Sequence, residues 1–122
     1  RREYEQSLAS WFTSMDVVPR EMTRDLVQAA ADNGVAIEIN ATACLLPDYY
    51  PESLRASYAD YVALLLDEGA TLSMCSDAHD IAQLGTTRLV EDLFERLAVP
   101  DDRIYHPSLP PRVTGAHLPP KA

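Results

Sequence analysis

The stretch Val35-Ala36-Ile37-Glu38-Ile39-Asn40-Ala41 indicates the fold class, because its side chains alternate between branched apolar and small or polar types. This alternation has the period of a β-strand, in which successive side chains point to opposite faces of a sheet. The three branched side chains therefore share one face, and Glu38 and Asn40 share the other. Residues 71–75 repeat the pattern, with two large apolar side chains opposite small or polar ones. We predict two strands, each apolar on one face only.

Around these strands, apolar residues recur at the three-to-four-residue spacing of helices. One helix follows Pro51 and is closed by Gly69, so it connects the two strands. Three more are predicted at about residues 3–13, 20–32 and 86–98. The apolar stripe expected for residues 20–32 consists of Met22, Leu26, Ala29 and Ala30.

The order strand, helix, strand predicts that the two strands are parallel and that the fold class is α/β. Strands that are apolar on one face fit a barrel wall, with helices outside and a polar lumen within. An open sheet with one solvated face would give the same alternation. The pattern leaves both architectures open.

The composition bounds the class of protein. The chain has 122 residues, 47% hydrophobic and 24% charged, which suits one globular domain. Its net charge of -9 makes general binding to nucleic-acid phosphates unexpected. No apolar run approaches the roughly 18 residues of a membrane helix, so no membrane association is expected. The two cysteines, Cys44 and Cys75, suit a reducing compartment, and we expect a cytoplasmic protein.

Asp77 and His79 follow the second strand and have the same parity as its polar residues. If the extended conformation continues, both side chains leave the C-terminal end of the strand on the polar side. A carboxylate and an imidazole placed there are suitable ligands for zinc, manganese or iron. The C-terminal ends of parallel strands are also where barrel enzymes hold their active sites.

Asp-x-His is a short pattern, and a structural interpretation stands beside the functional one. Asp77 could be a turn residue or a helix cap and His79 a surface side chain. Asn40, at the end of the first strand, could contact a substrate or bond the loop backbone. The other histidines, His106 and His117, lie in a proline-rich tail and are expected to face solvent.

These residues resemble the end of a PHP domain, a family named after polymerases and histidinol phosphatases. The likeness covers about residues 22–104. It depends on several features in order: the strand at residues 35–40, a helix ending near Gly69, the segment Ser76-Asp77-Ala78-His79, and Leu84-Gly85 shortly after.

The resemblance implies a distorted seven-stranded (β/α) TIM-like barrel with up to three divalent metal ions at the C-terminal strand ends. It implies a hydrolase that cleaves phosphate esters, with a small phosphorylated metabolite or nucleotide as substrate. In that family Asp77 and His79 match the last pair of metal ligands, with Asp77 also catalytic, and Asn40 lies near the substrate.

The resemblance also implies that about half of a complete barrel is missing. The family's earlier histidine ligands and its middle glutamate ligand would precede Arg1. The chain is expected to supply the C-terminal portion of the barrel domain in residues 1–105, followed by a proline-rich tail in residues 106–122. The missing half, or another chain, would complete the site, and this part alone is expected to be inactive.

Two other functions remain open on the sequence. One is a non-catalytic PHP-like scaffold module associated with a DNA polymerase. The other is a metal-dependent amidohydrolase with a similar aspartate at a strand end. A His-x-His pair upstream of Arg1 would favour the phosphoesterase over the scaffold.

Overall fold

The computed structural model describes residues 13–47 and 49–108. The helix expected at residues 3–13 lies almost wholly outside them, as does His117. The elements follow one another as η1 (Met15–Val17), α2 (Arg20–Asp32), β1 (Ile37–Asn40), α3 (Glu52–Asp67), β2 (Leu72–Cys75), η2 (Ile81–Thr86), α4 (Thr87–Arg96) and η3 (Asp101–Arg103). The helices expected after Pro19, after Pro51 and near residues 86–98 are confirmed.

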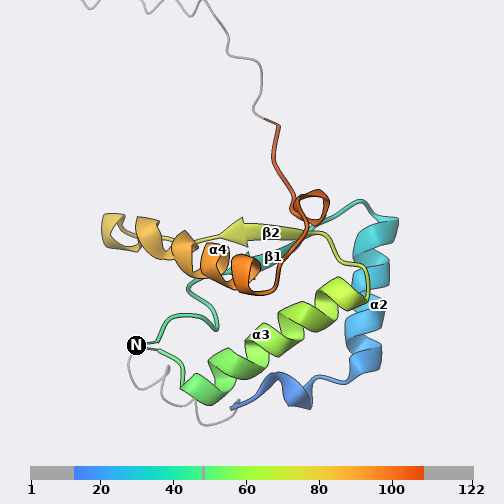
Figure 1. Ribbon diagram of the computed structural model, residues 1–122, viewed down its shortest axis with the longest axis horizontal. Helices are drawn as coiled ribbons and strands as arrows, with labels where there is room; N and C mark the ends of the chain where they lie inside the picture. Colours follow the sequence, from blue (N-terminus) through green and yellow to red (C-terminus); the bar gives the residue numbers. More distant parts are fainter. Residues whose placement is uncertain (1–12, 48, 109–122) are drawn as a thin grey trace, which may run out of the picture.

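The two strands form a parallel pair, as the strand–helix–strand order predicts (Figure 1). Ile37 is paired with Leu72 and Asn40 with Cys75, so the polar residues of both strands share one face. The fold class is therefore mixed α/β. Both strands are four residues long, shorter than the alternating segments that predicted them.

A third segment runs along the outer edge of β2. Ile104 forms a parallel bridge with Leu72, and the Tyr105 amide donates to the Leu72 carbonyl at 2.7 Å. The chain thus passes from β2 through α4 to a third parallel position. Pro107 follows soon after, and a proline cannot donate to a strand ladder.

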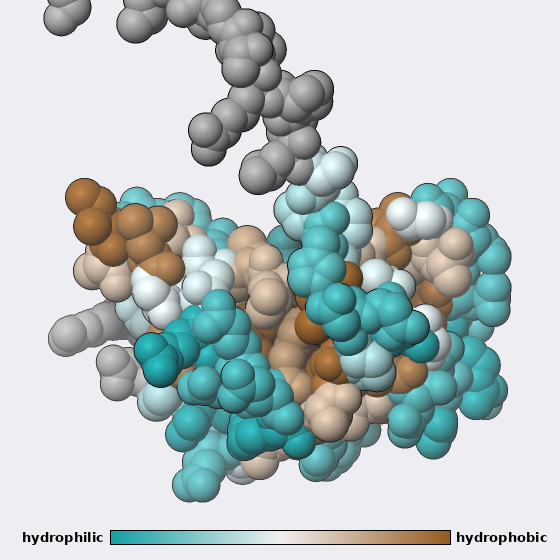
Figure 2. Space-filling model, turned by 45° about the horizontal axis from the view of Figure 1, so that its top comes forward, coloured by the Kyte–Doolittle hydropathy of each residue, from teal (hydrophilic) through white to brown (hydrophobic). Residues whose placement is uncertain are grey.

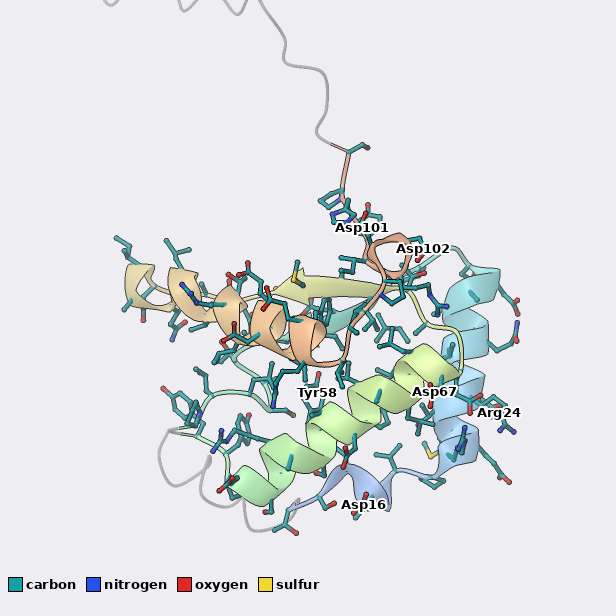
Figure 3. All side chains as sticks on the ribbon, viewed as in Figure 1. Asp16, Arg24, Tyr58, Asp67, Asp101 and Asp102 are labelled. Carbon is teal, nitrogen blue, oxygen red and sulfur yellow. The ribbon has the colours of Figure 1, made fainter. Side chains whose placement is uncertain are left out.

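The core lies between the apolar face of the strands and helices α3 and α4 (Figure 1). Ile39 and Leu72 are almost fully buried there, against Val62 and Leu65 of α3 and Leu93 of α4. Other buried members are Val27, Ala41, Leu45, Tyr58, Ala70, Val90 and Phe94. Tyr58 of α3 is directed into this region (Figure 3), and its burial raises the pKa of its hydroxyl.

The opposite face of the strands is the more exposed one. Glu38 is exposed, and Asn40, Ser73 and Cys75 are half-buried. On the apolar side Met74 is the exception, with 39% of its surface exposed. No helix in the described ranges is long and apolar enough to cross a membrane.

The apolar stripe expected for α2 is wrong. The side of α2 that packs inward carries Thr23 and Val27, whereas Met22 and Leu26 are 63% and 48% exposed. Arg20 and Arg24, one turn apart, both contact Glu68 at the end of α3, at 2.9 and 3.1 Å. α2 is rotated about its axis so that Arg20 and Arg24 reach Glu68 while Thr23 is buried beside Tyr61. The same rotation turns Met22 outward.

Candidate metal site at the strand ends

The backbone leaves the extended conformation immediately after β2. The strand ends at Cys75, and Asp77 has a φ of 52°, in the left-handed region. Aspartate tolerates this conformation better than most residues. Its amide donates to the Cys75 sulfur at 3.3 Å. The expectation that the extended conformation continues through His79 is therefore wrong, and a tight turn positions both candidate ligands instead.

The imidazole of His79 is oriented by this turn. Its Nδ1 lies 2.7 Å from the backbone carbonyl oxygen of Asp77. Because a carbonyl only accepts hydrogen bonds, Nδ1 is the donor in this contact, and in the neutral imidazole Nε2 then carries the lone pair. Within residues 13–47 and 49–108 the structure gives Nε2 no hydrogen-bond partner. The ring is thus held in the tautomer that can donate Nε2 to a metal ion.

The backbone of His79 is fixed by the next element. Its amide donates to Oε1 of Gln83 at 2.8 Å. Asp80 begins η2, and its carboxylate accepts the Gln83 amide at 3.1 Å. Asp80 therefore caps η2 through its side chain, while the Gln83 side chain reaches back to the backbone of His79.

The turn after β1 is joined to the turn after β2. The Thr42 hydroxyl donates to the Ser76 carbonyl oxygen at 2.6 Å. Asn40 Oδ1 accepts the amides of Thr42 and Ala43 at 2.9 and 3.0 Å, and its Nδ2 lies 3.3 Å from a Glu38 oxygen. These hydrogen bonds from the Asn40 side chain therefore stabilise the conformation of the loop that carries Thr42.

Asp77 and His79 are both exposed, as an open binding site requires. The Asp77 carboxylate has no hydrogen bond or ion pair to any described residue. Across the same residues, no three side chains of His, Cys, Asp or Glu are grouped so that they could hold a metal ion. Burial raises the pKa of the Cys44 thiol, which disfavours the thiolate form that binds metal ions. Asp77 and His79 thus stand as two candidate ligands, and the described residues group no third donor with them.

The surface beside these donors is apolar. Ile81 and Leu84 of η2 are 87% and 62% exposed. Figure 2 shows hydrophobic surface gathered at the end of the molecule that η2 forms. His106 lies elsewhere, on the segment after η3, where it contacts the exposed Asp101 at 3.1 Å (Asp101 is labelled in Figure 3).

Sequence patterns indicated Asp77, His79 and Asn40 but not the residues that hold them. Thr42 is one hydroxyl in a loop, and only the parallel register shows that it faces Ser76. No protein-family model, curated protein or solved structure matches this chain.

Proposed function

We propose that this chain contributes two metal ligands, Asp77 and His79, to a metal-dependent phosphoesterase of the PHP type. The main support is the 2.7 Å contact between His79 Nδ1 and the Asp77 carbonyl, which leaves Nε2 as the donor atom. Metal-binding histidines generally have their other nitrogen held in this way. With the Asp77 carboxylate, the donor set is one nitrogen and one oxygen, which suits zinc, manganese or iron.

In this proposal the fold is the C-terminal part of a distorted (β/α) barrel of seven strands. Three observations support it: the strands are parallel, α3 and α4 pack on their apolar face, and Ile104 occupies a third parallel position. The face carrying Glu38 and Asn40 would line the lumen. Asp77 follows the C-terminal end of β2, where barrel enzymes place their catalytic groups.

Two ligands do not complete a metal centre, since zinc takes about four. Within residues 13–47 and 49–108, no strand pairs with the other edge of β1, and this edge offers a place for the missing part. The amides of Ile37 and Ala41 donate toward β2, and alternate residues of a strand face the same neighbour, so the peptide groups of Glu38 and Asn40 point away from β2. Further strands on this edge, from an upstream part of the protein or from another chain, would bring the remaining ligands to the site.

The bound metal ions would polarise a phosphoryl group and lower the pKa of a bound water. Asp77 would bind metal through its carboxylate and hold the attacking water by accepting its hydrogen bond. His79 would bind through Nε2. Asn40 would contribute only Nδ2 to a substrate, because its oxygen already holds the loop. The chain is acidic and would repel a phosphorylated substrate. Such a substrate would therefore bind only after metal ions have made the local electrostatic potential positive.

One observation favours a second candidate function. Asp77 and His79 are both exposed, and the apolar side chains of Ile81 and Leu84 beside them are exposed as well, as a PHP-like scaffold module that binds a partner protein without catalysis would need. Sequence upstream of Arg1 discriminates between the two. The phosphoesterase requires a His-x-His pair on an early strand, and the scaffold does not.

The test uses the chain expressed together with its upstream coding sequence. Hydrolysis of p-nitrophenyl phosphate and histidinol phosphate would be measured with manganese or zinc, for wild type, Asp77→Asn and His79→Gln. We expect both variants to lose metal and activity by orders of magnitude, with His106→Gln as the unaffected control. Full activity and full metal content in both variants would contradict the proposal.

A further inference from the structure

The exposed apolar side chains of η2 share one face of that 3-10 helix. Such a helix has about three residues per turn, so side chains three positions apart lie above one another. Ile81 and Leu84 are related in this way, and they are 87% and 62% exposed. Gln83 and Thr86 form another column, which is half-buried. The two large apolar side chains are therefore presented together, away from the core.

Hydrogen bonds hold this apolar face against the turn that carries the candidate ligands. Gln83 lies between Ile81 and Leu84 in the sequence, and its Oε1 accepts the His79 amide at 2.8 Å. The amide of Gln83 donates to the Asp80 carboxylate at 3.1 Å. One residue of η2 is thus bonded to both residues that precede the helix. The positions of Ile81 and Leu84 relative to the backbone of His79 are fixed by these contacts.

The charges of the turn determine which part of a phosphate ester can lie where. Asp77 and Asp80 are both acidic and both exposed, so the turn repels a phosphate until a metal ion is bound. A phosphate held by that metal would lie at Asp77 and His79. The organic group of the ester would then lie on the surface beside them, and η2 supplies that surface with apolar side chains (Figure 2).

We propose that Ile81 and Leu84 bind the organic group of the substrate, and that the site prefers phosphate esters whose alcohol carries an aromatic or aliphatic group. This inference rests on the proposed function and deepens it, because it names the class of substrate and the residues that select it. An apolar group that covers both side chains removes exposed hydrophobic surface from water. A small polar alcohol such as glycerol gains nothing from the same surface.

Phosphonates test this preference, because they are not hydrolysed and binding is then measured apart from turnover. The affinities of phenylphosphonate and methylphosphonate would be compared with manganese present, for the chain expressed together with its upstream coding sequence. Ile81→Ser and Leu84→Ser remove the apolar contact at exposed positions, where the core is not disturbed. The matched control is Val17→Ser, because Val17 is 62% exposed on another 3-10 helix, η1.

We expect wild type to bind phenylphosphonate about tenfold more tightly than methylphosphonate. Each η2 variant should lose most of this preference and keep its affinity for methylphosphonate, and Val17→Ser should behave as wild type. Manganese-dependent binding with no preference for the phenyl group, or with a preference that survives both η2 substitutions, would overturn this inference and leave the proposed function standing. Binding that neither manganese nor Asp77→Asn affects would contradict the proposed function and this inference with it.

Discussion

The hydroxyl of Thr42 donates a 2.6 Å hydrogen bond to the carbonyl oxygen of Ser76, and this contact joins the turns that follow the two strands. Ser76 immediately precedes Asp77. The backbone of the candidate ligand is therefore held from β1 as well as from β2. Positioning of Asp77 should depend on a residue 35 positions earlier in the chain, which has no ligand atom of its own.

Replacing Thr42 by valine tests this dependence, because valine keeps the shape and removes the donor. The variant should lose about 1 kcal/mol of unfolding free energy, the usual net value of such a bond. Amide chemical shifts of residues 76–79 should move with it. Thr71→Val at the other end of β2 is the control, since the Thr71 hydroxyl has no hydrogen bond to the described residues. Equal shifts at residues 76–79 in both variants would refute a positioning role.

The left-handed backbone conformation of Asp77 allows the effect of this residue on stability to be measured separately from the effect of its charge. Asparagine tolerates a φ of 52° and lacks the carboxylate, so Asp77→Asn should remain within about 0.5 kcal/mol of wild-type stability. Alanine is disfavoured in this region, so Asp77→Ala should lose about 1–2 kcal/mol. Urea unfolding of both variants measures the difference. Equal stability of the two would show that Asp77 does not hold this conformation in solution.

The core between the strands and α4 should control global stability. Leu93 is fully buried, and Leu93→Ala should cost about 2–5 kcal/mol through lost burial and the resulting cavity. Leu84, 62% exposed on η2, is the matched control and should change stability little when replaced by alanine. Comparable losses in the two variants would contradict the packing described for α4.

The Glu68 carboxylate should make stability fall in acid. Hydrogen bonds from Arg24 first and Arg20 second lower the pKa of Glu68 below its usual range. The unfolded chain therefore takes up this proton more readily than the folded protein. The contribution is present above the usual carboxyl pKa of about 4 and is lost as the pH falls below it and through the lowered pKa of Glu68.

Thermal unfolding of wild type and Glu68→Gln from pH 7 to pH 3 measures this loss. The variant should be less stable at pH 7, and its difference from wild type should shrink as the pH falls. Glu91→Gln, an exposed position on α4 outside the ion pairs described, controls for loss of a surface charge. A difference between wild type and Glu68→Gln that is independent of pH would rule out the ion-pair explanation.

Periodicity predicted the two strands and the three helices, because burial on one face imposes a period that the residues display, and the order of these elements predicted that the strands are parallel. It misassigned the buried side of α2, where Thr23 is inside and Met22 is outside. Contacts from Arg20 and Arg24 to Glu68, 44 or more residues away, accompany that rotation, and local hydropathy does not contain them. For Asp77 the sequence left a turn and a continued extended strand both open, since alternation describes a strand and says nothing of where it ends.

The central claim is that Asp77 and His79 together bind a divalent metal ion, and a zinc titration of the chain followed at its histidine ring nitrogens tests it most directly. His106 is an internal control, since it is also exposed and also lies beside an aspartate. We predict that His79 Nε2 shifts at lower zinc concentrations than His106, and that Asp77→Asn removes this preference. A His79 signal that responds no earlier than His106, or that responds equally in Asp77→Asn, would contradict the assignment.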